Sequence, residues 1–208
     1  MIVERGEDPG SFSAPRDYVS YLRECFRRRC AYCLTPDNRL GGEEGMKVDH
    51  FIPESRNKDL RLTWSNLYYS CDVCNNRKSN FPMPKEEQSG KRFVDPCAED
   101  PDHHFRLVKD SATGDFCQVA WLSSPAEYEV KKLQFNRRPF LRDFWRELNA
   151  AERSLFSRRS HVLALRSGLD HIDDDATWLL NDCEQSLDRI RELWPFPRDR
   201  SAEEMHHE

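Results

Sequence analysis

The spacing of apolar residues along the chain predicts helices near both of its ends. From Arg16 onward the apolar side chains follow a helical period, which indicates a helix that leads towards Cys30. A second helix is expected from Ser124 to near Asn136, and a longer one begins at Pro139. A last helix carries apolar residues at alternating intervals of three and four, at Leu180, Cys183, Leu187, Ile190 and Trp194. This stripe predicts the core of a helical cap, although it would also suit a partner helix.

Short strands are predicted between these helices. Residues 46–52 alternate loosely before Pro53, and residues 66–70 form a second short stretch. A helix is expected from Cys74 onward, and two following prolines stop it. Three later stretches also predict short strands, at residues 91–94, 104–108 and 116–122, the last two joined by a hairpin turn at 110–114. The expected fold class is α+β, with a strand–strand–helix core, a small β-hairpin extension and a C-terminal helical cap.

These patterns divide the chain into five parts. Residues 1–15 are rich in Gly, Pro and Ser and predict an irregular lead-in before a core at residues 16–90. A β-rich extension at residues 91–124 and a helical region at residues 125–195 follow. Residues 196–208 are expected to form a loose tail.

Composition narrows the class of protein. The 208 residues carry a formal net charge of -5, whereas a protein that grips nucleic acid alone usually presents a basic surface. Targeting to nucleic acid would then be shared with a partner. No apolar run approaches the roughly 20 residues that a membrane helix needs, and the first ten residues do not resemble a secretory signal. We therefore expect a cytoplasmic protein with no membrane association.

Four of the eight cysteines form two Cys-x-x-Cys pairs, Cys30 with Cys33 and Cys71 with Cys74. In a reducing compartment this spacing favours thiolates that bind a metal over disulfides. Zn²⁺ takes four tetrahedral ligands, and the two pairs supply all four, which leaves no open position for catalysis. We predict a structural zinc site here, and we expect the unpaired cysteines to be core residues.

A second group of polar residues lies between and just after the cysteine pairs. Asp49 and His50 are adjacent, and Asn66 and Asn75 follow. Hydrolysis of a phosphodiester needs a base that deprotonates water and a cation on the scissile phosphate. Adjacent residues of a regular strand point to opposite faces, so only a local bend or bulge would let Asp49 and His50 share one centre.

These residues and their neighbours resemble the HNH, or ββα-metal, nuclease family. The resemblance rests on Asp49-His50 with Pro53, then Asn66-Leu67, then Cys71-x-x-Cys74-Asn75-x-x-Lys78. It implies a metal-dependent endonuclease with Asp49 and Asn75 as ligands of a catalytic Mg²⁺ or Mn²⁺. It further implies His50 as the general base and Asn66 as the residue that orients the His50 imidazole.

One position departs from the common pattern of the family, where His stands in place of Asn75. An Asp and Asn oxygen pair suits hard Mg²⁺ or Mn²⁺ better than a metal bound through imidazoles. Arg77 and Lys78 follow directly in the sequence. They are candidates for phosphate contacts, and simple surface charge is the alternative interpretation.

A narrower resemblance covers roughly residues 20–145. The chain is similar there to the PtuB-type HNH nucleases of the Septu and some retron anti-phage systems. The additional matching residues are Phe93-Val94-Asp95-Pro96, Glu99-Asp100 and Leu133-Gln134-Phe135-Asn136 before Arg138. This resemblance implies a defence nuclease with DNA as the favoured substrate, a PtuA-like ATPase partner and, in some systems, retron components.

Two other hypotheses stay open. The first is a catalytically inactive zinc-knuckle module that binds nucleic acid or protein, although such a scaffold would need only the cysteines. The second is a stand-alone restriction-type nuclease, which the negative net charge and the lack of a recognisable DNA-reading module disfavour.

Overall fold

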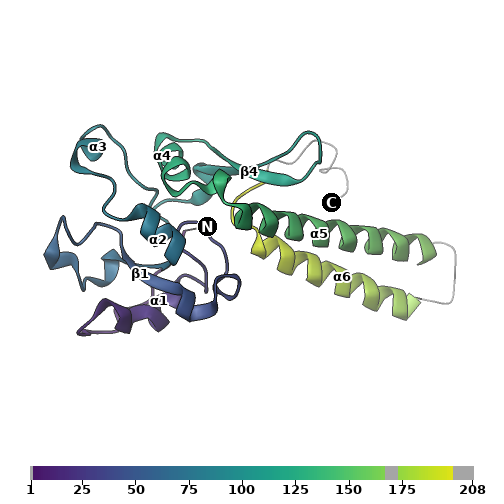
Figure 1. The fold of residues 1–208 in the computed structure, drawn as a ribbon. Coiled ribbons are helices and arrows are strands. Elements are labelled where there is room, and N and C mark those ends of the chain that lie inside the picture. The colour runs from purple at the N-terminus through teal and green to yellow at the C-terminus, as the bar shows by residue number, and fades with distance from the viewer. Residues whose placement is uncertain (1, 167–172, 199–208) are drawn as a thin grey trace.

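The computed structural model describes residues 2–166 and 173–198. Figure 1 shows a body made of short helices and two small sheets, from which two long helices project side by side. These are α5 (Pro139–Arg166) and α6 (Asp173–Leu193). The mixture of helices with two separate two-stranded sheets confirms the predicted α+β class.

The predicted strand–strand–helix core is present. Strand β1 (Met46–His50) pairs antiparallel with β2 (Leu67–Cys71). Helix α2 (Asp72–Lys78) follows β2 without a break, and the Sγ atom of Cys71 accepts a hydrogen bond from the Cys74 backbone at 3.4 Å. Cys71 is thus both the last strand residue and the cap of the helix, which explains why the helix begins two residues before Cys74.

The helix predicted to lead towards Cys30 is shorter than expected. Helix α1 (Val19–Cys25) ends because Arg27 and Arg28 have φ values of 50° and 58°, in the left-handed region that a helix cannot use. The chain then turns back, and the Ala31 backbone donates a hydrogen bond to the Tyr69 carbonyl at 2.7 Å. This reversal brings the first cysteine pair against β2.

The β-rich extension is partly as predicted. Strands β3 (Phe105–Lys109) and β4 (Phe116–Trp121) form the expected hairpin, and the Asp110 carboxylate caps its turn. The prediction of a strand at residues 91–94 is wrong, since this segment joins no sheet. Its Val94 backbone instead donates to the side chain of Glu129 at 3.0 Å. A short helix, α3 (Pro84–Gln88), precedes this segment, and α4 (Ser124–Leu133) follows the hairpin and ends three residues before Asn136.

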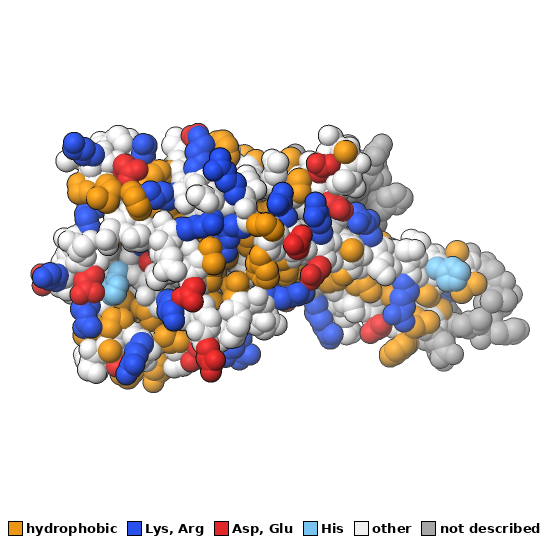
Figure 2. Space-filling model, viewed as in Figure 1, with side chains coloured by type: hydrophobic (Ala, Val, Ile, Leu, Met, Phe, Trp, Pro, Cys, Tyr) orange, Lys and Arg blue, Asp and Glu red, His pale blue; other side chains and the backbone are white. Residues whose placement is uncertain are grey.

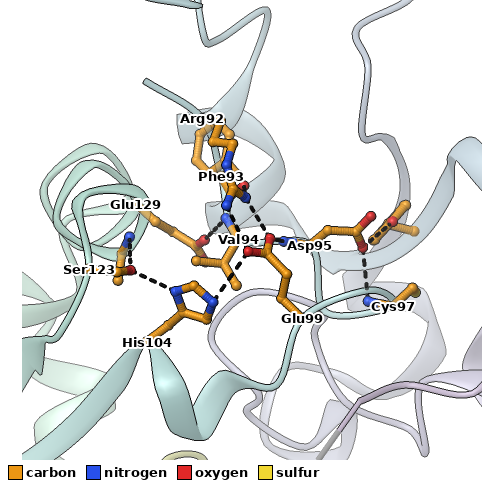
Figure 3. A network of polar contacts seen from close by, with 11 residues as sticks. Arg92, Phe93, Val94, Asp95, Cys97, Glu99, His104, Ser123 and Glu129 are labelled. Atoms are coloured by element: carbon orange, nitrogen blue, oxygen red, sulfur yellow. Dashed lines mark hydrogen bonds and ion pairs between the residues drawn. The ribbon is translucent and has the colours of Figure 1, made fainter. Parts of the chain in front are cut away.

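Side chains, rather than a sheet, hold the segment after α3 in place. Figure 3 shows the network that does so. Glu99 pairs with Arg92 at 2.5 and 2.7 Å and accepts the Asp95 backbone N–H at 3.0 Å. His104 lies between the Glu99 carboxylate, at 3.3 Å, and the Ser123 hydroxyl, at 2.6 Å. The network therefore fastens the segment to β3 and to the start of α4.

The long helices share the main core only at their base. Near the body, α5 contributes Leu141, Phe144, Trp145 and Leu148 to the main cluster of buried side chains. Farther out, a small separate cluster consists of Val162, Ala176 and Leu180. None of the helices among residues 2–166 and 173–198 has the length and apolar character needed to cross a bilayer.

Both ends of the described chain contact the body. Residues 2–12 contain no helix or strand, as expected, but Arg5 donates to the carbonyls of Trp64 and Leu67 at 2.9 and 2.8 Å. The prediction of a loose tail is wrong for its first residues, because Phe196 is buried and the Leu107 backbone donates to the Pro197 carbonyl at 2.7 Å. The rest of the predicted tail, residues 199–208, lies outside the described residues.

Candidate functional site

The two cysteine pairs meet in one cluster. Their four Sγ atoms all lie within 4.8 Å of one another, and all four side chains are buried. A tetrahedral zinc site with Zn–S bonds of about 2.3 Å has sulfur atoms about 3.8 Å apart, so the cluster is of the right size for Zn²⁺. None of the eight cysteines forms a disulfide. The residues predicted for the structural zinc are thus brought together from the turn after α1 and from the β2–α2 corner.

An arginine far away in the sequence completes this cluster. Arg138 is 6% exposed and places its guanidinium 3.1 Å from Cys74 Sγ and 3.9 Å from Cys71 Sγ. Four thiolates around Zn²⁺ would leave a net charge of about -2, which a buried cation offsets. Burial lowers the pKa of Arg138, but the neighbouring thiolates of Cys74, Cys33 and Cys71 raise it by more, so the guanidinium stays charged.

The imidazole of His50 is fixed by a main-chain carbonyl. Its Nε2 lies 2.9 Å from the carbonyl oxygen of Arg61. Because a carbonyl oxygen only accepts hydrogen bonds, Nε2 carries a proton, and in the neutral ring Nδ1 then holds the lone pair. The ring is therefore in the tautomer that a general base acting through Nδ1 requires.

Asn66 acts on the loop around His50 rather than on its ring. The Asn66 side chain accepts the Ile52 backbone N–H at 2.8 Å and donates to the carbonyls of Ile52 at 3.0 Å and Leu60 at 3.3 Å. Leu60 precedes Arg61, whose carbonyl holds the imidazole. The orienting role expected for Asn66 is therefore indirect, since the amide clamps the loop that supplies the contact to His50.

Asp49 is almost fully buried at the end of β1, with 4% of its surface exposed. Its carboxylate accepts hydrogen bonds from the Tyr32 hydroxyl and from the Lys78 ammonium group, the latter at 3.0 and 3.2 Å. Burial raises the pKa of Asp49, and the nearby charge of Lys78 and the hydroxyl of Tyr32 oppose that shift. Burial likewise lowers the pKa of Lys78, against the attraction of Asp49. We assign the pair as carboxylate and ammonium, because each compensates the charge of the other.

One polar cavity is lined by three of the predicted site residues, Asp49, His50 and Asn75, but not by Asn66. It has a volume of about 370 Å³ and lies between the end of β1 and helix α2. Its lining residues are Val48, Asp49, His50, Pro53, Glu54, Asn75, Asn76, Ser79 and Asn80. Asp49 and His50 are adjacent in the sequence, and both are among the residues that line this cavity at the end of β1. Carboxylate and amide oxygens dominate the lining, and this donor set fits Mg²⁺ or Mn²⁺.

The two candidates for phosphate contacts point elsewhere. Arg77 donates to the Leu133 carbonyl at 2.8 Å and so caps the C-terminal end of α4. Lys78 is completely buried against Asp49, so the prediction that it contacts phosphate is wrong for this arrangement. Figure 2 shows that Lys and Arg side chains on the face drawn are scattered among acidic ones and form no single basic patch.

Neither the roles of Tyr32 and Glu129 nor the burial of Lys78 follows from the sequence analysis. Tyr32 lies inside the first Cys-x-x-Cys pair, and Lys78 lies four residues after Cys74, so it occupies the same inward face of α2. That spacing was the available signal for its burial. Glu129 reaches the same region from α4, and burial raises the pKa of this carboxyl to about 8. For Arg138, 64 residues from Cys74, we find no local signal.

Comparison with known proteins agrees with this geometry. Residues 30–81 match the family model described as HNH endonuclease. Two similar curated proteins are both described as Septu protein PtuB. That of Bacillus thuringiensis is 31% identical over 87 residues, which cover 41% of this chain and 31% of the relative. That of Bacillus mycoides (strain KBAB4) is 28% identical over 142 residues, which cover 56% of this chain and 46% of the relative. The chain thus spans less than half the length of these two relatives. No solved structure matches.

Proposed function

We propose, from the HNH endonuclease domain that residues 30–81 form, that this protein hydrolyses phosphodiester bonds of nucleic acid with the help of a divalent cation. The observation that carries the proposal is the polar cavity onto which Asp49, His50 and Asn75 all open. An inactive zinc-knuckle scaffold would have no need for these three side chains in one place.

In this proposal His50 is the general base. The Arg61 carbonyl holds the Nε2 proton, so Nδ1 is the atom that takes a proton from the attacking water. The resulting imidazolium keeps its hydrogen bond to Arg61, which limits movement of the ring during the reaction. Asn66 preserves this arrangement because it fixes both Ile52 and Leu60, on either side of the loop.

Asp49 and Asn75 would hold the catalytic cation. A bound Mg²⁺ or Mn²⁺ would stabilise the negative charge that develops on the scissile phosphate and on the leaving oxygen. Asp49 offers a carboxylate oxygen whose orientation is fixed by Tyr32 and Lys78. Asn75 offers an amide oxygen from the first turns of α2. The four cysteines have a separate role, since a filled tetrahedral zinc site has no position for substrate.

We further propose that the protein acts as the effector nuclease of a bacterial anti-phage system of the Septu type, in the cytoplasm and with DNA as substrate. Similarity to two Septu PtuB proteins supports this. A PtuA-like ATPase would be the partner, and retron components would join it in related systems. The net charge of -5 is consistent with recruitment to nucleic acid through a partner.

The test of the nuclease proposal compares wild-type protein with two histidine variants. Plasmid DNA, single-stranded DNA and RNA would each be incubated with the protein in Mg²⁺, Mn²⁺ or EDTA, with and without a co-purified partner. His50→Ala should lower the cleavage rate by about 10²- to 10⁴-fold, as expected for loss of a general base, and should retain zinc. His103→Ala changes an exposed histidine outside the cavity and should cleave at the wild-type rate.

Cleavage that needs a divalent cation and disappears only in the His50 variant supports the proposal. Absence of cleavage under every condition would favour the scaffold, and equal cleavage rates for wild type and His50→Ala would refute the assignment of His50 as the general base. The partner is tested separately by co-expression with the neighbouring genes and affinity purification. Recovery of the nuclease alone would argue against a stable ATPase complex.

A further inference from the structure

Lys78 is a completely buried lysine next to the proposed nuclease centre. Its ammonium group lies 3.0 Å from Oδ2 and 3.2 Å from Oδ1 of Asp49. It also donates to the main-chain carbonyl of His50 at 2.6 Å. Lysine is almost never fully buried unless it is paired, so these contacts account for its position.

These hydrogen bonds connect two neighbouring residues through one cation. Lys78 holds the side chain of Asp49 and the main chain of His50. On the other side of the same peptide segment, the Phe51 backbone donates to the Asn66 carbonyl at 2.9 Å. The end of β1 is therefore held by hydrogen bonds to Lys78 of α2 and to Asn66, which directly precedes β2.

An aromatic ring, that of Phe93, lies next to the ammonium group. The ring of Phe93 lies 5.8 Å from Lys78 Nζ, within range of a cation–π interaction. Tyr32, which donates its hydroxyl proton to Asp49, packs edge-on against the same Phe93 ring with centroids 6.0 Å apart. Phe93 belongs to the segment held by the network in Figure 3, in which Arg92 donates to the Phe93 carbonyl, so the position of Phe93 is itself fixed.

We propose that Lys78 is a positioning residue of the nuclease: it fixes the Asp49 carboxylate and the His50 main chain so that both side chains face one cavity. The inference rests on the proposed function. It also ties two adjacent strand residues to one cation, because Lys78 links the Asp49 side chain to the peptide group that follows His50. Lys78 does not touch the substrate in this role.

Kinetics distinguish positioning from phosphate binding. Lys78→Met keeps the length and apolar part of the side chain but removes the ammonium, and Lys47→Met makes the same change at an exposed lysine of β1. We expect Lys78→Met to lower kcat by about 10²-fold, the loss that displacement of catalytic groups by about 1 Å can cause. The KM for nucleic acid and the salt dependence of binding should stay at wild-type values.

A residue that contacted phosphate would behave differently. Its loss would raise KM and reduce the slope of log binding constant against log salt concentration by about one. That result, or a kcat equal to that of wild type, would overturn the proposal. Zinc content and thermal unfolding, with Lys47→Met as the control, show whether each variant is folded.

A second measurement does not depend on folding of the Met variant or on activity. Nuclear magnetic resonance of ¹⁵N-labelled wild-type protein at neutral pH should show one lysine ammonium signal protected from exchange with water. The signal should shift in Asp49→Asn and should be unchanged in Lys47→Met. If wild type cleaves no substrate, the proposed function fails while this signal still tests the contact. Absence of any protected ammonium signal would refute the positioning role.

Discussion

Replacing Arg138 with Met tests whether the buried cation supports the zinc site. The change removes one charge-assisted contact, 3.1 Å from Cys74 Sγ, and a longer one, 3.9 Å from Cys71 Sγ. A hydrogen bond to a charged group contributes about 1.5–3 kcal/mol. Loss of an outer-shell partner typically weakens metal binding by about 10- to 100-fold, or about 1.4–2.7 kcal/mol. The hydrogen-bond estimate and the metal-affinity estimate both give a loss of about 2 kcal/mol for Arg138→Met.

The assay is a zinc titration in competition with a chromophoric chelator, followed by thermal unfolding of the zinc-loaded protein. Arg138→Met should bind zinc about 10- to 100-fold more weakly than wild type. For a chain of this length, a loss of 2 kcal/mol should lower Tm by about 4–8 °C. Arg137→Met is the matched control, because Arg137 is the exposed neighbour in the sequence. Zinc affinity within twofold of wild type in Arg138→Met would show that the cation is dispensable.

Three further variants probe the remaining parts of the site. Cys71→Ser should lose zinc and should no longer unfold cooperatively, because structural zinc contributes about 10 kcal/mol or more to folding. Metal analysis and calorimetry would show this, and full zinc content with an unchanged Tm would count against the site. Asn66→Ala removes three hydrogen bonds to the loop backbone, so the free energy of unfolding in urea should fall by about 1.5–4 kcal/mol. The kcat should also fall, and an unchanged urea midpoint would disprove the role of Asn66 in holding the loop. Burial raises the pKa of Glu129 from 4.5 to about 8, so between these values the folded protein holds a proton that the unfolded chain has released. The free energy of unfolding of the wild type should therefore fall as pH rises from about 4.5 to about 8, by up to about 5 kcal/mol from this group. In urea unfolding at several pH values, Glu129→Gln should show a weaker dependence of stability on pH. An equal dependence in both proteins would contradict the raised pKa of Glu129.

The features that could be predicted from the sequence are those with local signals. Two Cys-x-x-Cys pairs have few interpretations in a chain of this kind, and the hairpin turn at residues 110–114 follows from residues that favour turns. The helix predicted to lead towards Cys30 is longer than α1 because the apolar period that predicts it carries no signal for where it ends. The left-handed φ values of Arg27 and Arg28 come from the path that the chain must take to bring Cys30 to the cluster.

The errors share a physical cause, which is contact between residues distant in the sequence. Residues 91–94 have the composition of a strand, but the Glu129 carboxyl takes the Val94 backbone N–H that a sheet would have used. Both interpretations of Lys78, phosphate contact and simple surface charge, require an exposed side chain, as lysine usually has, and only its pairing with Asp49 reverses that preference. The contact between Arg138 and Cys74 spans 64 positions, a separation that periodicity and spacing do not report.

The position of Arg138 directly before α5 connects the zinc site to the long helices. Helix α5 begins at Pro139, directly after the arginine that touches the thiolates, and its 28 residues extend about 42 Å. Helix α6 returns along α5, and Phe196, which follows α6 in the sequence, is buried in the main core. Among the described residues, the buried cluster of the outer half is much smaller than the main core at the base, so the outer half should open at a lower free energy. Because Arg138 contacts Cys74, the base of the long helices is joined to the part of α2 that carries Asn75, the neighbour of Cys74.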